Sequence, residues 1–151
     1  MRDAAEYIKA EKTALRLIAR AEQCSGGLSL KLEKKGFDEI CIRDVISRLF
    51  ELNLLDDRRF ARMWLQTKIR FAKSPRRLFS SLCRRGIDRE DAQAAMKETL
   101  DEETEFSMLR KFAEKKSWTS GADNTRSLKH LLKNEGFSTK AVQRFLEENQ
   151  L

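Results

Sequence analysis

Glycine, proline and long apolar runs are scarce in this 151-residue sequence. It holds six glycines and one proline, too few to supply the turns of an all-β protein. No apolar run approaches the roughly 18–20 residues that a membrane-spanning helix needs, and residues 1–24 lack the apolar core of a signal peptide. Apolar residues still make up 40% of the chain, enough to build a core. The sequence therefore predicts a helical, soluble, intracellular protein.

Cysteine and histidine are also rare, and the common catalytic motifs are missing. The three cysteines, Cys24, Cys41 and Cys83, cannot all pair within the chain, and no Cys/His cluster has zinc-site spacing. We interpret them as reduced apolar fillers in a cytoplasmic protein. The one histidine, His130, has no evident nucleophile to serve, and GxxxxGKS, GxGxxG and HExxH motifs are absent. The sequence thus predicts no enzyme activity, no cofactor and no metal.

A repeat of 50 residues runs through the chain. It is marked by Gly36, Gly86 and Gly136, with apolar residues aligned around each glycine. A glycine can end a helix in the left-handed conformation, and the residue after it then packs on the last turn. Asp or Ser follows next, a preferred helix N-cap. Each copy predicts a helix, a glycine stop, a cap and a second helix. The aligned sets are Leu28, Leu78 and Leu128; Leu32, Leu82 and Leu132; Phe37, Ile87 and Phe137; and Asp38, Asp88 and Ser138.

A third helix precedes each of these pairs, over residues 3–23, 57–72 and 102–116, by apolar spacing. We interpret Asp56 and Asp57 as the N-cap of the second of these helices, not as an acid–base pair. The glycines outside the repeated stops, Gly26, Gly27 and Gly121, are expected in loops. The prediction is an all-α chain of nine helices in three tandem three-helix repeats, residues 1–53, 54–100 and 101–151. Because one such repeat buries little surface alone, we expect an elongated, curved array.

The net charge of +7 is concentrated in the second repeat. Residues 54–100 hold twelve basic and six acidic residues, whereas the other two repeats are nearly balanced; residues 58–85 hold ten basic residues and no acidic one. On the helix over 57–72, most of these lie opposite the face of Phe60, Trp64 and Phe71. A merely solvated face usually mixes signs, so we predict a surface that binds a polyanion or an acidic protein. Its residues are Arg58, Arg59, Arg62, Arg70, Lys73, Arg76, Arg77, Arg84 and Arg85.

Several of these stretches resemble the RecX family of recombination regulators. They are residues 14–23, LEKKGF at 32–37, LLDDRRFA at 54–61 and LCRRGI at 82–87. The combination of KGF, LLDDxRFA and a second glycine stop at this spacing is specific. The resemblance covers nearly the whole chain and is strongest over residues 14–100. It implies a non-enzymatic modulator of the RecA recombinase that lies along the groove of the RecA–single-stranded DNA filament and reduces ATP hydrolysis, strand exchange and coprotease activity.

The resemblance also sets the expected partners and leaves two alternatives open. We expect a cytoplasmic monomer that binds the RecA nucleoprotein filament, contacts the DNA within it and binds no membrane. The first alternative is a helix-turn-helix-like protein that binds nucleic acid directly and independently of RecA. The second is a helical adaptor for an acidic protein. The residues expected to have structural roles are Gly36, Gly86, Gly136, Asp56, Asp57 and Phe60.

Overall fold

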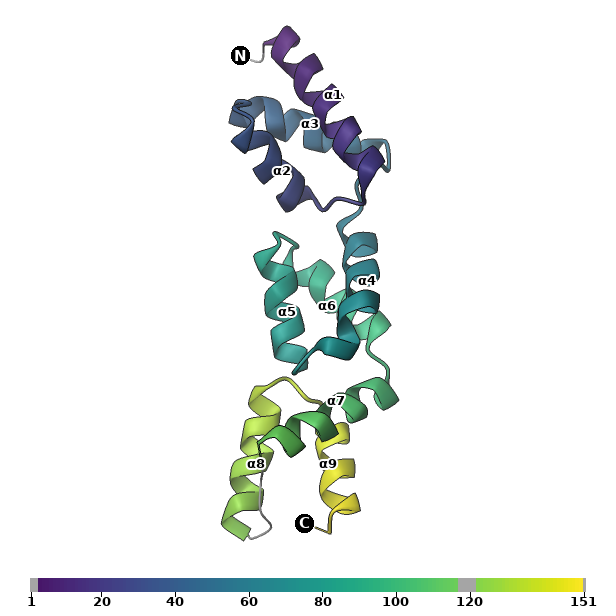
Figure 1. Cartoon of the computed structure of the whole chain (residues 1–151), viewed down its shortest axis with the longest axis vertical. Coiled ribbons are helices and arrows are strands. Elements are labelled where there is room, and N and C mark those ends of the chain that lie inside the picture. The colour runs from purple at the N-terminus through teal and green to yellow at the C-terminus, as the bar shows by residue number, and fades with distance from the viewer. Residues whose placement is uncertain (1–2, 117–121, 151) are drawn as a thin grey trace.

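The computed structural model describes residues 3–116 and 122–150 of the chain. Within these residues it contains nine α-helices, one short 3-10 helix and no strand. The helices form three successive groups of three, stacked along one long axis with the two termini toward opposite ends (Figure 1). The predicted all-α, elongated array of three-helix repeats is confirmed.

Each group, called a unit from here on, packs its first and third helices most extensively against each other. Unit 1 consists of α1 (Ala4–Arg20), α2 (Ser25–Lys34) and α3 (Glu39–Glu51); unit 2 of α4 (Asp57–Lys68), the 3-10 helix η1 (Ile69–Phe71), α5 (Pro75–Arg84) and α6 (Arg89–Thr99); unit 3 of α7 (Glu102–Lys115), α8 (Ala122–Asn134) and α9 (Thr139–Glu148).

The second helix of each unit ends at one of the three repeated glycines. Gly36, Gly86 and Gly136 have φ angles of 90°, 91° and 87°, the left-handed conformation that costs other residues a Cβ clash. The N–H after each glycine donates to the carbonyl oxygen of the leucine five residues earlier, at 3.2 to 3.3 Å. This is the hydrogen bond of a Schellman stop, so the predicted helix stop is confirmed. The three leucines are fully buried: Leu32, Leu82 and Leu132.

The third helices begin at the predicted caps, with one difference. The side chain of Asp38 accepts from the N–H of Ile40 at 3.1 Å, and that of Ser138 from the N–H of Ala141 at 3.1 Å. The side chain of Asp88 makes no capping bond. The prediction of a side-chain cap is therefore right for units 1 and 3 and wrong for unit 2.

Asp56 and Asp57 have different roles at the start of α4. Asp56 is the N-cap, and its Oδ1 accepts from the N–H of Arg59 at 3.0 Å. Asp57 is 8% exposed and accepts instead from the N–H and hydroxyl of Ser25 in unit 1, at 2.7 and 2.5 Å. The cap interpretation is wrong for Asp57, because its carboxylate reaches the first turn of α2 and joins the two units.

The first two helix boundaries also differ from the prediction. α1 ends at Arg20, and Gly26 and Gly27 lie inside α2 instead of in a loop. Gly26 is needed within that first turn, since a Cβ there would lie 2.7 Å from the Cα of Gly86 in unit 2. The helix expected over 57–72 ends at Lys68 and continues as the 3-10 turn η1. Gly121 lies outside the described residues.

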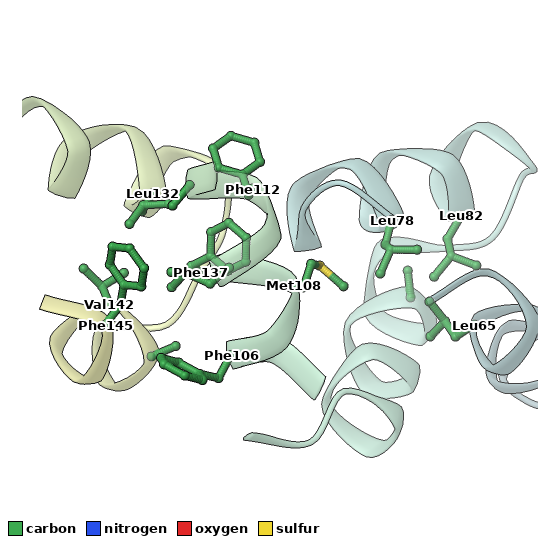
Figure 2. Packing of buried hydrophobic residues seen from close by; sticks show 14 of the residues in the cluster. Leu65, Leu78, Leu82, Phe106, Met108, Phe112, Leu132, Phe137, Val142 and Phe145 are labelled. Atoms are coloured by element: carbon green, nitrogen blue, oxygen red, sulfur yellow. The ribbon is translucent and has the colours of Figure 1, made fainter. Parts of the chain in front are cut away.

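The buried apolar residues form two clusters. One belongs to unit 1 alone and is centred on Leu28, Leu32 and Leu49; the other extends through units 2 and 3. Figure 2 shows Met108 of α7 lying between the unit 3 aromatic residues and the leucines of unit 2, and Met108 is only 5% exposed. Units 2 and 3 therefore share one core, whereas unit 1 has its own.

Candidate polyanion-binding surface

The three arginines of α4 are paired with carboxylates outside that helix. Such half-exposed pairs each contribute little stability, but they offset the positive charge of the predicted surface locally. The Arg59 pair also crosses from unit 2 to unit 1. The α4 part of the predicted surface is therefore engaged within the protein. The pairs are Arg58 with Asp91 at 3.4 Å, Arg59 with Glu22 at 2.7 Å and Arg62 with Glu98 at 3.3 Å.

Arg76 at the start of α5 is engaged at the junction with unit 3. Its guanidinium lies 2.8 Å from Glu135, and its backbone N–H donates to the Glu135 carbonyl at 2.9 Å. Glu135 also accepts from the hydroxyl of Ser74, a fully buried side chain, at 2.7 Å. Burial alone would raise the pKa of Glu135, but the hydrogen bonds from Arg76 and Ser74 and the nearby arginine charges outweigh it and lower that pKa. Arg76 thus has a structural partner.

The other five predicted basic residues keep their charge unpaired. Within the described part of the chain they make no ion pair. Arg84 only donates to the Ser81 hydroxyl at 3.5 Å, and the guanidinium of Arg85 lies 5.3 Å from the ring centre of Trp64. The effective cationic surface is therefore smaller than predicted. Arg70, Lys73 and Arg77 lie where unit 2 meets unit 3, whereas Arg84 and Arg85 lie at the other end of α5, which faces unit 1.

A cleft of about 410 Å³ opens where unit 2 meets unit 3. Its walls are η1, the first turn of α5 and the last turns of α7. Six of its nine lining residues are basic, and none of them is acidic. We call these nine residues the junction cleft: Arg70, Phe71, Ala72, Lys73, Arg77, Lys111, Phe112, Lys115 and Lys116.

Sequence reasoning missed the unit 3 half of the junction cleft. Unit 3 has no net charge, because acidic residues fill the first turn of α7 and lysines fill its end, as the helix dipole favours. The net charge of the whole repeat does not show this separation of acidic and basic residues along α7. The signal that could have found it is the i, i+4 spacing of Lys111 and Lys115, which places both on one side of α7.

Phe71 also departs from the prediction. It was assigned to the apolar face of the helix over 57–72, yet it is 72% exposed. The physical reason is that α4 ends at Lys68, and the tighter winding of η1 changes the direction in which later side chains point. Phe60 and Trp64, on α4 itself, pack against the core of units 2 and 3 as predicted.

A second basic hollow lies along α5 and shares one lining residue with the junction cleft. Its volume is about 850 Å³, and Arg77 lines both hollows. None of its lining residues is acidic. Arg89, at the start of α6, is a basic residue outside the predicted set, and its guanidinium lies 5.6 Å from the Phe79 ring centre. The basic side chains of this hollow are Arg76, Arg77, Arg84 and Arg89.

The remaining candidate groups show no chemical constellation. None of the three cysteines, all within the described residues, forms a disulfide, and Cys24 and Cys41 are buried as predicted. His130 is exposed on α8. No group of His, Cys, Asp or Glu within residues 3–116 and 122–150 could hold a metal ion. Among the described helices none has the length and apolarity to span a bilayer. Trp118 lies outside the described residues.

Fold and surface together define a tandem helical-repeat protein with an unpaired cationic face at its second junction. Two family models match, "RecX, first three-helix domain" over residues 10–49 and "RecX, second three-helix domain" over residues 56–96. The chain is 33% identical to the "Regulatory protein RecX" of Treponema pallidum (strain Nichols) over 139 residues, 91% of this chain and 84% of that protein. The chain therefore belongs to the RecX family of regulatory proteins.

Two further relatives also match most of this chain. The "Regulatory protein RecX" of Caldanaerobacter subterraneus subsp. tengcongensis is 27% identical over 143 residues, 93% of this chain and 72% of its own. The crystal structure of RecX from Lactobacillus salivarius superposes with a TM-score of 0.74, at 21% identity and over 97% of both chains. That structure shares the fold of all three units, so the tandem arrangement is common to both chains.

Proposed function

We propose that this chain is a non-enzymatic regulator of the RecA recombinase. In this proposal it binds the RecA–single-stranded DNA filament along its groove and inhibits ATP hydrolysis, strand exchange and coprotease activity. Membership of a family of regulatory proteins supports the regulatory role. The observation that carries the mode of binding is the set of unpaired basic side chains on one part of an elongated stack of helices.

The physical match lies in shape and charge. A nucleoprotein filament presents a long groove lined by DNA phosphates and by acidic protein side chains. An elongated, three-unit array can follow such a groove (Figure 1). Arginine forms forked hydrogen bonds with phosphate and carboxylate, and four of the five unpaired predicted residues line the two hollows at unit 2. The proposal further holds that the protein acts as a cytoplasmic monomer and needs no cofactor.

The test is RecA ATPase activity on single-stranded DNA, titrated with this protein and with the variant R70E/R77E/R84E. These arginines are exposed and unpaired, so the helical circular dichroism should not change. We expect the wild type to inhibit and the variant to lose most of that inhibition. The matched control reverses three exposed basic residues of unit 1, K9E/K12E/K34E, for the same change in net charge.

Three results would decide against the proposal or a part of it. Full inhibition by R70E/R77E/R84E would remove the basic surface from the mechanism. Equal loss in the variant and the control would mean that only net charge matters. If the wild type does not affect RecA at any concentration, the regulatory role itself is wrong.

The two alternative functions predict different binding preferences. A direct nucleic-acid-binding protein should shift naked single-stranded DNA at least as well as RecA-coated DNA in a gel, with steep salt dependence. A filament regulator should prefer the coated form. An adaptor for an acidic protein should keep its partner in a pull-down after nuclease treatment and should ignore both DNA forms.

A further inference from the structure

The junction cleft contains an aromatic ring, that of Phe71, which is largely exposed. Phe71 is the most exposed of the large apolar side chains in the described structure, at 72%. The guanidinium of Arg70 lies 4.9 Å from its ring centre, which holds the ring by a cation–π contact. The ring is therefore fixed at one side and open at the cleft.

Six basic side chains line the same cleft as this ring, and they come from two different units. Arg70, Lys73 and Arg77 belong to unit 2, and Lys111, Lys115 and Lys116 at the end of α7 belong to unit 3. A volume of about 410 Å³ is within the range of about 300–1,000 Å³ that small-molecule sites occupy, so one nucleotide fits it. Open aromatic rings among cations are the means by which proteins hold single strands, with a base stacked on the ring and phosphates on the cations.

We propose that the junction cleft is a subsite for single-stranded nucleic acid, in which a base stacks on Phe71 and the flanking phosphates bind the lysines and arginines. The inference rests on the proposed function and deepens it, because it names the DNA strand, not RecA, as what this part of the surface contacts. The strand continues over Arg77 into the hollow along α5, where Arg84 and Arg89 supply further phosphate contacts.

The chemistry of the cleft favours a single strand over other polyanions. In a duplex the base faces are stacked on each other and are not available to an aromatic ring. An acidic peptide would use the cations but has no planar base to place on Phe71. Inorganic phosphate or polyphosphate would likewise gain nothing from the ring.

The junction cleft is also not a by-product of the repeat. Fifty residues before Lys73 and Arg77 stand Gln23 and Gly27, so the α5 wall of the cleft has no charged counterpart on α2. The hollow on unit 1, along α2 and α3, is instead lined by residues of both signs, among them Glu33, Glu39 and Arg43. The concentration of charge is specific to the second junction.

The test measures binding of a fluorescein-labelled oligothymidylate of about 12 nucleotides, a length within the usual site size, by anisotropy. F71L keeps an apolar side chain but removes the ring, and F71Y keeps the ring. We expect F71L to bind about tenfold more weakly, F71Y to bind within about twofold of wild type, and both to show the same salt slope. Because Phe71 is exposed, neither variant should disturb folding, which circular dichroism checks.

Replacement of Lys111 and Lys115 should change the salt dependence of binding, which replacement of Phe71 should not. Each phosphate contact on a single strand contributes about 0.7 to the slope of log K against log salt. We therefore expect K111Q/K115Q to reduce that slope by about 1.4, while the control K12Q/K34Q in unit 1 leaves both slope and affinity as in wild type. An unchanged slope in K111Q/K115Q, or an equal loss in the control, overturns the assignment of the phosphates.

Competition separates the other polyanions. If duplex DNA or poly-glutamate of equal charge displaces the oligothymidylate as well as unlabelled oligothymidylate does, the subsite is not for single strands and the inference is wrong. Wild-type affinity in F71L also overturns it.

RecA ATPase, measured on the same variants, keeps this inference apart from the proposed function. If the wild type inhibits RecA but does not bind the oligothymidylate, the subsite is overturned and the proposed function stands. If binding depends on Phe71 but the protein has no effect on RecA, the subsite stands and the proposed function is overturned.

Discussion

The two junctions between units use the same positions of the repeat and hold them together by different chemistry. At the first, the thiol of Cys24 donates to the carbonyl of Arg85 at 3.4 Å; fifty residues later, the hydroxyl of Ser74 donates to the carboxylate of Glu135 at 2.7 Å. In both, the start of one unit's second helix docks on the glycine stop of the next unit's second helix. The repeat determines which positions of neighbouring units are in contact, and the residues at those positions determine the type of contact.

Both junctions have polar contacts, but the first adds a close approach of two glycines and the second adds an apolar core shared by units 2 and 3. Gly26 and Gly86 approach so closely that a Cβ on Gly86 would lie 2.8 Å from the Cα of Gly26. At the second junction Arg76 replaces the first of these glycines and pairs with Glu135, and Met108 fills the space between the cores. The junction cleft lies at this second junction.

Removing Met108 should have the largest effect on this difference. M108A leaves a cavity in the core of units 2 and 3 and should lower the free energy of unfolding by about 3 kcal/mol, measured by urea denaturation. M63A is the matched control, because Met63 is 48% exposed on α4 and its loss should cost less than about 0.5 kcal/mol. Similar values for the two variants would show that the cores are not joined through Met108.

Alanine at the glycine stops separates backbone strain from junction contact. All three glycines have positive φ, so each substitution costs about 1 kcal/mol of conformational strain. Gly36 has nothing near its missing Cβ, Gly136 has the N of Arg76 at 3.1 Å, and Gly86 has a Cα at 2.8 Å. We expect losses of unfolding free energy in the order G86A, G136A, G36A, with G86A costing about 1–2 kcal/mol more than G36A.

Equal losses at Gly36 and Gly86 in urea denaturation would contradict the close contact of the first junction. Circular dichroism of the folded variants should stay helical in all three cases, because the helices themselves are not interrupted.

The carboxylate of Asp57 should matter more than a comparable surface carboxylate. D57N leaves the backbone N–H and hydroxyl of Ser25 without their charged acceptor and should cost about 1.5 kcal/mol. D91N, also in the first turn of a helix, loses only the half-exposed pair with Arg58 and should cost about 0.5 kcal/mol or less. Thermal or urea unfolding of both variants measures the difference, and a larger effect of D91N would refute the role of Asp57.

Acid should weaken the second junction through Glu135, the smallest of these effects. The pKa of Glu135 is lowered by folding from its ordinary value of 4.5. A carboxyl group with a lowered pKa contributes stability above its unfolded pKa and loses it as the pH falls through the folded value. The stability advantage of wild type over E135Q should therefore be present at neutral pH and shrink below about pH 4.5. A pH-independent difference in urea unfolding would contradict this.

Much of the fold could be predicted, because its signals are local. Gly86 ends α5 for a steric reason contained in its own backbone, and Leu82 and Ile87 satisfy the same stop within six residues. The exceptions involve partners distant in sequence. The sequence around Gly26 does not indicate its contact with Gly86, so Gly26 is expected in a loop. The sequence around Asp57 does not indicate its hydrogen bonds to Ser25, so Asp57 is interpreted as a cap.

The candidate site was less predictable, because charge neutralisation depends on tertiary contacts. Helix geometry placed Arg62 and Arg70 on one basic stripe, but it did not indicate that Glu98 pairs with Arg62. Nor did it bring in Lys115, which lies in a repeat without net charge. Whether Arg70, Lys73, Arg77, Arg84 and Arg85 bind the partner stays a prediction.

The sequence alone determined the helical class, the three repeated units and the excess of basic residues in the second, since composition, capping and glycine conformation act over a few residues. The tertiary structure decided which basic residues remain unpaired and that η1 turns Phe71 outward. It also decided that three lysines at the end of α7 line the same cleft as that ring. These features depend on contacts between side chains of different units, which rules that act over a few neighbouring residues do not predict.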